Sequence, residues 1–258
     1  MSLEGRCAVV TGGGRGIGEA VARALAGAGA SVVVAARTRE QIEAVAALLR
    51  DAGHTAFAIQ CDVTDPDAVE RMAREAVERL GHVDILVNNA GGAGSAPLHR
   101  LTLEEWNRLL TLNATSTFLC TRAFAPAMAE RGWGRIINIA SVAGLVGARY
   151  IAAYAAAKHA VVGFTRAVAA ELAASGVTVN AVCPTYVDTD LTREAVARIV
   201  EKTGLTEQEA RDRLVAMNPQ GRLIEVDEVA HVVLALCADG ARGINGQAIA
   251  IDGGARGA

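Results

Sequence analysis

Lysine is almost missing from this sequence: of the 25 lysine and arginine residues, only Lys158 and Lys202 are lysines. Aromatic residues are also scarce, at 3% of the chain, so small and aliphatic side chains must do most of the packing. A basic excess is absent as well, because 28 acidic residues give a formal net charge of -3. Proteins that hold nucleic acid through its phosphates usually carry such an excess, so we expect no nucleic-acid partner.

Closely spaced cysteines and long apolar runs are missing too. The cysteines lie more than fifty residues apart and form no Cys-x-x-Cys pair, which argues against a metal site or a disulfide framework. No run approaches the roughly 18 apolar residues of a membrane span, and the first residues lack the pattern of a signal peptide. We therefore expect a cytoplasmic protein with no membrane partner and no metal. Its cysteines should be reduced and mostly buried: Cys7, Cys61, Cys120, Cys183 and Cys237.

Short runs rich in valine and isoleucine alternate with longer segments of helical period. This alternation predicts βα units around a parallel sheet, whose buried strands read as nearly continuous apolar runs. We predict one doubly wound α/β domain over residues 1–258, with a seven-stranded parallel sheet flanked by helices. The expected strands are Cys7–Thr11, Ser31–Ala35, Thr55–Gln60, Asp84–Asn88, Arg135–Ile139, Thr178–Val182 and Gln247–Ile251.

Several helix boundaries are marked by residue type. Thr38 and Gln41 predict a capping box at the start of one helix, which Gly53 should end. Asp65 followed by Pro66 predicts the start of the next. The segment 185–220 breaks the alternation, since it is long, charged and partly helical. Long structured insertions are often binding loops or lids, so we assign it to the substrate.

A glycine-rich run, Thr11–Gly18, follows the first expected strand and opens the first helix. Glycines there allow a tight turn and close approach to a pyrophosphate at the helix N-terminus. The strict Gly-x-Gly-x-x-Gly spacing is not met, and the absence of a following Gly-Lys-Ser/Thr argues against a P-loop NTPase. A plain glycine-rich turn is the alternative, but the position between strand and helix favours a dinucleotide.

Arginine replaces the expected carboxylate at the end of the second strand. Dinucleotide sites usually place an acidic residue there for the adenosine ribose. Here Ala36 takes that position and Arg37 follows it, with Arg15 in the glycine loop. Two guanidinium groups fit a 2′-phosphate, so we expect NADP(H) rather than NAD(H). The alternative is that Arg37 is only an exposed residue at a helix start.

Tyr154 and Lys158 are four residues apart on an expected helix and therefore share one face. With three tyrosines and two lysines in the chain, this spacing is unlikely to arise by chance. A tyrosine is a poor base at neutral pH, and an adjacent ammonium should lower its pKa by favouring the phenolate. We interpret the pair as catalytic.

Five motifs in order resemble those of the short-chain dehydrogenase/reductase family: Thr11-Gly12-x-x-x-Gly16-x-Gly18, Asn88-Asn89-Ala90-Gly91, Ser141, Tyr154-x-x-x-Lys158 and Asn180-Ala-Val-Cys-Pro184. The resemblance runs from Gly5 to Gly254 and implies a Rossmann-type fold. Within the family the chain is most similar to 3-oxoacyl thioester reductases and polyketide ketoreductases. One departure is Thr185, where many relatives have glycine after the proline. Its side chain is expected beside the nicotinamide pocket.

The resemblance implies a catalytic group of Asn113, Ser141, Tyr154 and Lys158. Tyr154 would donate a proton to the carbonyl oxygen, which Ser141 would hydrogen-bond. Lys158 would bind the nicotinamide ribose, and Asn113 would fix the water that reloads the proton. Taken alone, Ser141 could be a strand-end cap and Asn113 a residue of a helix kink.

The cofactor residues expected from the loop and from the resemblance come from five parts of the chain. Asp62 and Val63 are assigned to the adenine. Asn89 is assigned to the ribose and pyrophosphate side, although it could instead stabilise the central sheet. The full set is Gly12, Gly14, Arg15, Gly16, Ile17, Gly18, Arg37, Asp62, Val63, Asn89, Ala90, Gly91, Tyr154, Lys158, Pro184, Val187 and Thr189.

The expected substrate is a ketone, most favourably a 3-oxoacyl thioester of coenzyme A or of a carrier protein, or a similar β-keto compound. Arg131 matches one basic residue that carrier-protein reductases present, but a second arginine near Glu171–Gly176 is missing. Candidate rim contacts are Arg149, His159, Arg193 and Arg198, although solvated helix faces would look the same.

Two other functions stay open. One is a secondary-alcohol or sugar/polyol dehydrogenase, and the other is an NADP-sensing regulator, which would not need Tyr154 and Lys158. The resemblance further implies a homotetramer built on the long helices expected over Thr102–Arg131 and Arg149–Ala174, and on the C-terminal strand.

Overall fold

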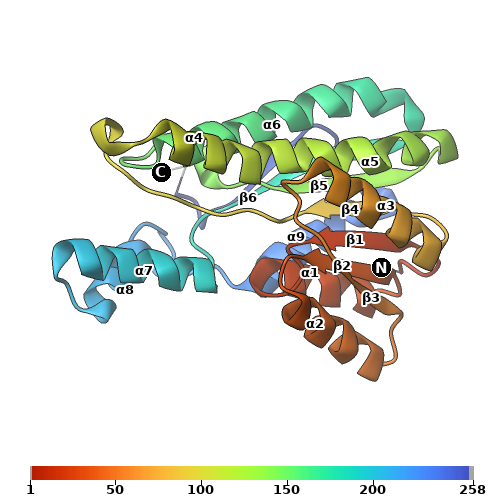
Figure 1. The fold of residues 1–258 in the computed structure, drawn as a ribbon, viewed down its shortest axis with the longest axis horizontal. Coiled ribbons are helices and arrows are strands. Elements are labelled where there is room, and N and C mark those ends of the chain that lie inside the picture. The colour runs from red at the N-terminus through yellow and green to blue at the C-terminus, as the bar shows by residue number, and fades with distance from the viewer. Residues whose placement is uncertain (1, 256–258) are drawn as a thin grey trace.

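Seven parallel strands form one sheet at the centre of the computed structural model, which describes residues 2–255. Their order, β3-β2-β1-β4-β5-β6-β7, places β1 beside β4, so the chain crosses over at this point. Figure 1 shows β5, β4, β1, β2 and β3 one below another, with helices around them. The strands are β1 (Cys7–Thr11), β2 (Ser31–Ala36), β3 (Ala56–Gln60), β4 (Ile85–Asn88), β5 (Gly134–Ile139), β6 (Val177–Pro184) and β7 (Ala248–Ile251).

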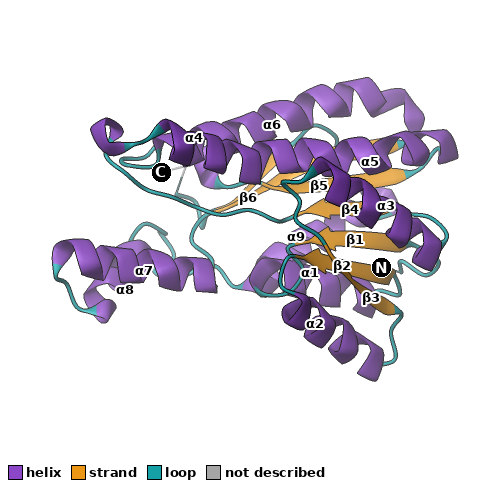
Figure 2. Ribbon diagram, in the orientation of Figure 1, coloured by secondary structure: helices purple, strands orange, loops and turns teal. Residues whose placement is uncertain are grey.

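Helices cover both faces of the sheet (Figure 2). On one face lie α1 (Gly16–Gly27), α2 (Arg39–Asp51) and α9 (Val226–Cys237). On the other lie α3 (Pro66–Leu80), α5 (Ser116–Arg131) and α6 (Ala152–Leu172). The remaining helices are α4 (Leu103–Leu110), α7 (Asp190–Thr203) and α8 (Glu207–Val215), with short turns at Leu98–Arg100, Thr111–Thr115, Val142–Gly144, Ala173–Ser175 and Asp239–Ala241.

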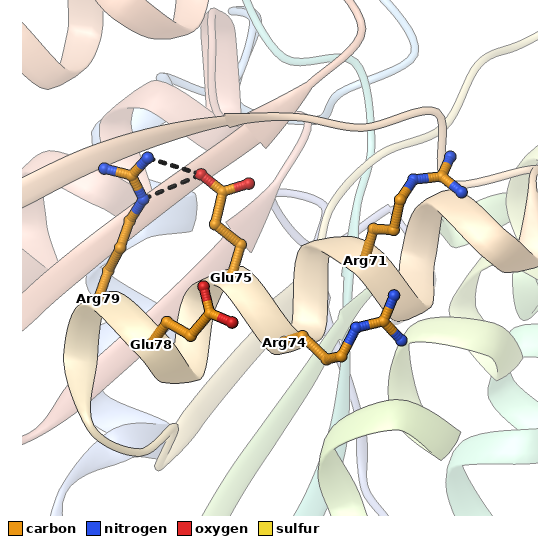
Figure 3. Close-up of a pocket in the computed structure, with 5 residues that line it drawn as sticks. All are labelled: Arg71, Arg74, Glu75, Glu78 and Arg79. Carbon is orange, nitrogen blue, oxygen red and sulfur yellow. Dashed lines mark hydrogen bonds and ion pairs between the residues drawn. The ribbon is translucent and has the colours of Figure 1, made fainter.

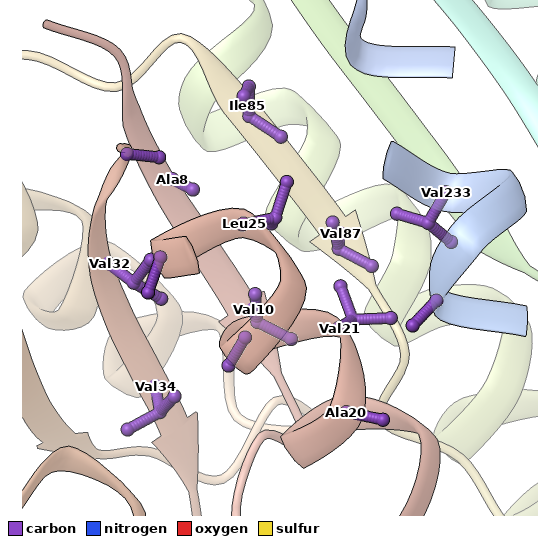
Figure 4. Packing of buried hydrophobic residues seen from close by; sticks show 14 of the residues in the cluster. Ala8, Val10, Ala20, Val21, Leu25, Val32, Val34, Ile85, Val87 and Val233 are labelled. Atoms are coloured by element: carbon purple, nitrogen blue, oxygen red, sulfur yellow. The ribbon is translucent and has the colours of Figure 1, made fainter. Parts of the chain in front are cut away.

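Alternation along each strand divides the core between the two faces. In β1, Ala8 and Val10 belong to the cluster under α1, whereas Val9 belongs to the cluster under α3 and α5. Figure 4 shows Val21 and Leu25 of α1 packed near Ala8 and Val10. Burying such aliphatic side chains contributes about 1.5–3 kcal/mol each. Because its side chains are packed on both faces, the sheet holds in place the loops at the carboxyl ends of its strands.

The predicted doubly wound α/β fold with seven parallel strands is confirmed. Strand bounds differ from prediction by two residues or fewer. Asp65 caps α3 by accepting from Asp67 N at 2.9 Å. The capping box at Thr38 is wrong: Thr38 precedes α2, but its side chain makes no cap hydrogen bond. Position alone could not tell whether the hydroxyl turns toward the helix end.

All five cysteines are buried, and none of the five is in a disulfide bond. Among residues 2–255, no helix combines the length and the apolar character that crossing a membrane requires.

Candidate active site

The glycine loop after β1 is tied to the loop after β4 by Thr11 and Asn89. The Asn89 amide nitrogen donates to Thr11 O and Gly12 O, both at 3.0 Å. The Thr11 hydroxyl accepts from Asn89 N and Ala90 N, each at 3.1 Å. The Asn89 side chain therefore links the end of β1 to the loop after β4. This is a structural role, as the alternative interpretation of Asn89 proposed. Sequence reasoning did not identify Thr11 as the partner.

Glycine is required where this loop turns. Gly12 and Gly16 have φ of +62° and +55°, a left-handed conformation that side chains with a Cβ rarely adopt. A Cβ on Gly18 would lie 2.5 Å from the Asn89 amide nitrogen. The loop leads directly into α1, whose first turn has unpaired N–H groups and the positive end of the helix dipole. This cradle fits the pyrophosphate of a dinucleotide.

Arg37 and Asp62 lie close together at the ends of β2 and β3. Burial opposes ionisation of Asp62, but hydrogen bonds from Thr64 N and Oγ1 and the positive charge of Arg37 outweigh it and lower the pKa of Asp62. The Arg37 side chain is exposed. It is therefore accessible to a phosphate at the edge of the cradle, with no acidic residue at Ala36 to repel that phosphate.

Arg15 lies between the glycine loop and α7. Its guanidinium is 3.2 Å from Asp190 Oδ2 and 4.0 Å from Glu194 Oε1. Next to it, a Cβ on Gly16 would approach the Thr189 methyl group at 3.3 Å. The predicted cofactor residues Gly16 and Thr189 therefore meet, and two carboxylates of the insertion contact Arg15. No sequence signal identified Asp190 or Glu194.

Tyr154 lies in the first turn of α6 and faces Ser141, which follows β5. The Ser141 hydroxyl donates a hydrogen bond to the phenol oxygen and accepts from Ala143 N at 3.1 Å. Burial nevertheless raises the pKa of Tyr154 to about 12. The expected lowering by Lys158 is wrong, because desolvation dominates and the Lys158 ammonium is directed elsewhere. Tyr154 keeps its proton at neutral pH.

Lys158, one turn along α6, is 5% exposed. Its Nζ donates to Ile139 O at 2.9 Å and lies 5.8 Å from the centroid of the Tyr154 ring. Burial lowers the pKa of Lys158 to about 8. A Cβ on Gly91 would lie 3.6 Å from this nitrogen, which places the loop after β4 against the ammonium.

Asn113 lies at the centre of a π-helical turn, Thr111–Thr115, between α4 and α5. Its amide nitrogen donates to Gly92 O at 2.9 Å and Leu109 O at 3.0 Å, and its oxygen accepts from Gly92 N at 3.2 Å. The helix expected over Thr102–Arg131 is thus distorted at Asn113, as its alternative reading predicted. Asn113 and Lys158 both approach Gly91, where a Cβ would lie 2.7 Å from Asn113 Oδ1 and 3.6 Å from Lys158 Nζ.

The insertion after β6 folds as the helix pair α7–α8, seen apart from the sheet in Figure 1. It has a small core of its own, in which Val196, Ala210 and Leu214 are buried with Tyr186 packed against them. Tyr186 is close enough to Tyr154 to add to the rise in the Tyr154 pKa. Sequence reasoning missed Tyr186, which connects this helix pair to the catalytic tyrosine candidate.

The remaining predicted residues of this segment lie between the sheet and α7. Pro184 ends β6, and Val187 is buried against the sheet core. The Val187 carbonyl accepts from Thr189 and Thr192 hydroxyls at 3.3 and 2.6 Å. Thr185, where many relatives have glycine, has a half-buried side chain. Its backbone N donates to Ile251 O at 3.0 Å and so continues the pairing of β6 with β7.

The basic rim candidates are not gathered at the site. Arg131 ends α5, donates to Val83 O and lies 3.8 Å from Asp84 Oδ1, where β4 begins. These are the amino ends of the strands, whereas Tyr154 faces Ser141 beyond the carboxyl end of β5, so Arg131 does not line this chain's active-site mouth. Arg193 is held by Asp190 and Asp188. Arg198 is near Tyr186.

An open hollow elsewhere, on the surface of α3, is lined by charged side chains of one helix (Figure 3). Arg79 Nη2 and Glu75 Oε1 are paired at 2.6 Å. Because its charges are of both signs and it holds no nucleophile, this hollow offers no basis for the predicted chemistry.

Within the part of the chain that the structure describes, one cluster has metal-ligand atoms close together: Cys7, His82 and Asp84. Arg6 and Arg131 approach the same Asp84 carboxylate at 4.0 and 3.8 Å. These cations already neutralise the carboxylate and would oppose a bound metal ion.

Comparison with known proteins identifies the family to which this chain belongs. Residues 6–199 match the family model described as short chain dehydrogenase. The chain belongs to the short-chain dehydrogenase family. It is 41% identical over 249 residues to a granaticin polyketide synthase putative ketoacyl reductase of Streptomyces violaceoruber, covering 96% of this chain and 92% of the relative.

Other members of the short-chain dehydrogenase family agree over the whole length. A 3-oxoacyl-[acyl-carrier-protein] reductase of Synechocystis is 40% identical over 255 residues, or 98% of each chain. The crystal structure of a variant of actinorhodin polyketide ketoreductase with NADPH is similar at a TM-score of 0.94 and 40% identity, covering 99% of both chains. The chain is thus an oxidoreductase of this family.

Proposed function

We propose that this protein is an NADP(H)-dependent ketoreductase that converts a β-keto compound, most favourably a 3-oxoacyl thioester, to its secondary alcohol. The observation that carries the proposal is the Ser141–Tyr154 hydrogen bond, with a phenol whose pKa is about 12. A hydroxyl that holds its proton at neutral pH is ready to donate it to a carbonyl oxygen that gains negative charge. The named ketoreductase relatives support the same reaction.

The cofactor fits the residues present. The glycine loop and the start of α1 would hold the pyrophosphate, while Arg15 and Arg37 supply two guanidinium groups for a 2′-phosphate. The similar ketoreductase structure contains NADPH. When bound, NADPH supplies the hydride that the ketone carbon accepts.

The protein's own groups then serve the carbonyl oxygen. The Ser141 hydroxyl donates a hydrogen bond to it, and the Tyr154 hydroxyl gives it a proton. Lys158, whose ammonium is held by Ile139 O, would bind the nicotinamide ribose, as the family resemblance implies. Asn113 holds Gly92 in place and, as the family resemblance implies, fixes the water that returns a proton to Tyr154.

The decisive experiment measures NADPH oxidation with acetoacetyl-CoA and with a carrier-linked 3-oxoacyl thioester. In parallel it measures NADP reduction with a panel of polyols. We expect turnover with the β-keto compounds. Tyr154→Phe should lose at least about 99% of kcat, a loss in line with general-acid catalysis, and still bind NADPH in a fluorescence titration. Unchanged turnover would remove Tyr154 from the mechanism.

Two results would replace the proposal. Oxidation of a polyol with no reduction of β-keto compounds would indicate the secondary-alcohol or polyol dehydrogenase. Tight NADPH binding with background oxidation for every substrate would indicate the NADP sensor.

We also propose that the protein is a cytoplasmic homotetramer. Support comes from the family resemblance and from α5 and α6, where Phe118 is 40% exposed and meets Phe164 edge-on at 6.3 Å. The buried cysteines, none of them in a disulfide bond, suit a reducing compartment.

A further inference from the structure

Tyr150 is the one non-glycine residue with positive φ among residues 2–255, at +70°. This left-handed conformation is costly for a residue with a Cβ, and such strain persists only when the surrounding structure imposes it. Its side chain is 60% exposed, so packing of the ring into the protein does not explain the strain. Strained residues often lie at functional sites, which makes Tyr150 a candidate for a role outside folding.

The backbone of Tyr150 joins two segments that border the active site. Ala96 N donates to Tyr150 O at 2.8 Å. This bond ties the loop that begins at Gly91 and Gly92, beside Lys158 and Asn113, to the segment between Ser141 and α6. Tyr150 also lines a small hollow with Ser95 and Ala153, the residue before Tyr154. The Tyr150 backbone is therefore fixed beside the start of α6, the helix that carries Tyr154.

Exposed apolar side chains also occur in these two segments and at the start of α4, which follows the first of them. The three most exposed large hydrophobic residues that the structure describes are Leu98 at 79%, Leu103 at 74% and Tyr150 at 60%. Val146, in the same segment as Tyr150, is 47% exposed. Exposed apolar groups grouped beside a site indicate something apolar that covers them. Of the basic candidates, Arg193 is held by Asp188 and Asp190, and Arg131 pairs with Asp84 at the start of β4.

We propose that Tyr150 determines substrate specificity: its ring packs against an apolar or aromatic body that the β-keto substrate carries beyond its ketone. This inference rests on the proposed ketoreductase function and names the substrate class. The left-handed backbone keeps the ring at the mouth, where a glycine would relax the turn but leave the substrate body uncovered. The strained backbone lowers the stability of the fold, and the ring that it presents increases selectivity.

Two uncharged β-keto esters test this, ethyl acetoacetate and ethyl 3-oxo-5-phenylpentanoate, which share the reacting group and differ in the phenyl body. Tyr150→Ala should lower kcat/KM for the phenyl ester about three- to ten-fold, the size of an aromatic contact. The value for ethyl acetoacetate should stay within about two-fold, since that ester has no body to lose contact. Tyr150→Phe keeps the ring and should retain both values. Leu48→Ala, an equally apolar and exposed change on α2, should alter neither.

Stability gives an independent reading. Tyr150→Gly should lose the same selectivity as Tyr150→Ala but unfold about 2–4 °C higher, because only glycine relieves the strain. An unchanged ratio of the two esters in Tyr150→Ala would overturn the inference, as would a change in particle mass by light scattering, which would assign the ring to a subunit contact. If the unaltered protein reduces acetoacetyl-CoA but neither ester, the inference about Tyr150 falls while the proposed function stands. If it reduces no β-keto compound, the proposed function itself fails.

Discussion

Burial shifts the pKa values of Tyr154 and Lys158 in opposite directions, because the protonated phenol is neutral whereas the protonated amine is charged. Desolvation raises the pKa of Tyr154 to about 12 and lowers that of Lys158 to about 8. Between pH 6 and 8 the pair therefore has a neutral phenol and an ammonium. This combination favours proton donation by Tyr154, the direction needed for ketone reduction.

The rate should consequently fall on the alkaline side. Above a pH of about 8 Lys158 loses its charge, so kcat/KM for NADPH, which reports the free enzyme, should decrease about ten-fold per pH unit. Lys158→Arg keeps a cation at every accessible pH and should remove this limb, although its absolute rate is lower. A profile that stays flat to pH 10 in the unaltered enzyme, measured by stopped-flow absorbance, would contradict the role of Lys158.

Cofactor preference should depend on Arg37. Arg37→Asp removes a charge-assisted contact to the 2′-phosphate and adds a repelling carboxylate, so the ratio of kcat/KM for NADPH to that for NADH should fall by about 100-fold. Arg39→Asp makes the same charge change two residues later, on another exposed arginine. Equal shifts in both variants would show a general field effect rather than a contact, and no shift in either would exclude Arg37 from the phosphate site.

At this scale the sequence predicted which residues meet but not their protonation. Tyr154 and Lys158 share a helix face by spacing alone, which needs no tertiary information. Their pKa values depend on β5 and β6, which bury them from outside that helix. The Arg15–Asp190 contact joins residues 175 positions apart, and no local pattern encodes it.

Among the elements, the helix pair α7–α8 differs from the rest because its apolar cluster is separate from the sheet core. Its boundaries are well marked: Thr206 forms a capping box with Glu209 at the start of α8. The sequence indicated an insertion over residues 185–220 by its break in periodicity. Sequence could not show that Tyr186 would be packed between that cluster and Tyr154, since this depends on how the pair folds back.

Weakening that cluster should affect the substrate more than the fold. Leu214 is 4% exposed, and Leu214→Ala should cost about 2–5 kcal/mol locally. Because the loss falls on the helix pair, we expect KM for the keto substrate to rise about five- to ten-fold with little change in Tm or NADPH affinity. Leu49→Ala, at 3% exposure in the main core, is the matched control and should lower Tm while leaving KM unchanged. A Leu214→Ala enzyme that behaves like this control would show that α7–α8 unfolds with the sheet and does not act on the substrate.

For the whole molecule, the position of the site follows from strand order. The chain adds β2 and β3 on one side of β1 and β4 to β7 on the other, so the strand order switches between β1 and β4. In open parallel sheets ligands bind at such a point, beyond the carboxyl ends of the strands. The glycine loop after β1 and Asn89–Gly91 after β4 meet there. Alternating βα segments predicted a parallel sheet, but periodicity alone does not order its strands.

The homotetramer proposed above would use the outer face of α5 and α6. Phe118 of α5, 40% exposed, lies beside Phe164 of α6 and under the Arg122 guanidinium at 5.2 Å from its ring centroid. In a homotetramer this ring would be buried against another copy, so Phe118→Glu should place an unpaired charge in the contact and break it. Light scattering of the unaltered protein should give about four times the chain mass of 26.6 kDa, and the variant a smaller particle whose Tm depends on concentration. Leu48→Glu, on the exposed side of α2 at 55% exposure, should leave the mass unchanged. A tetramer that survives Phe118→Glu would move the interface away from α5 and α6.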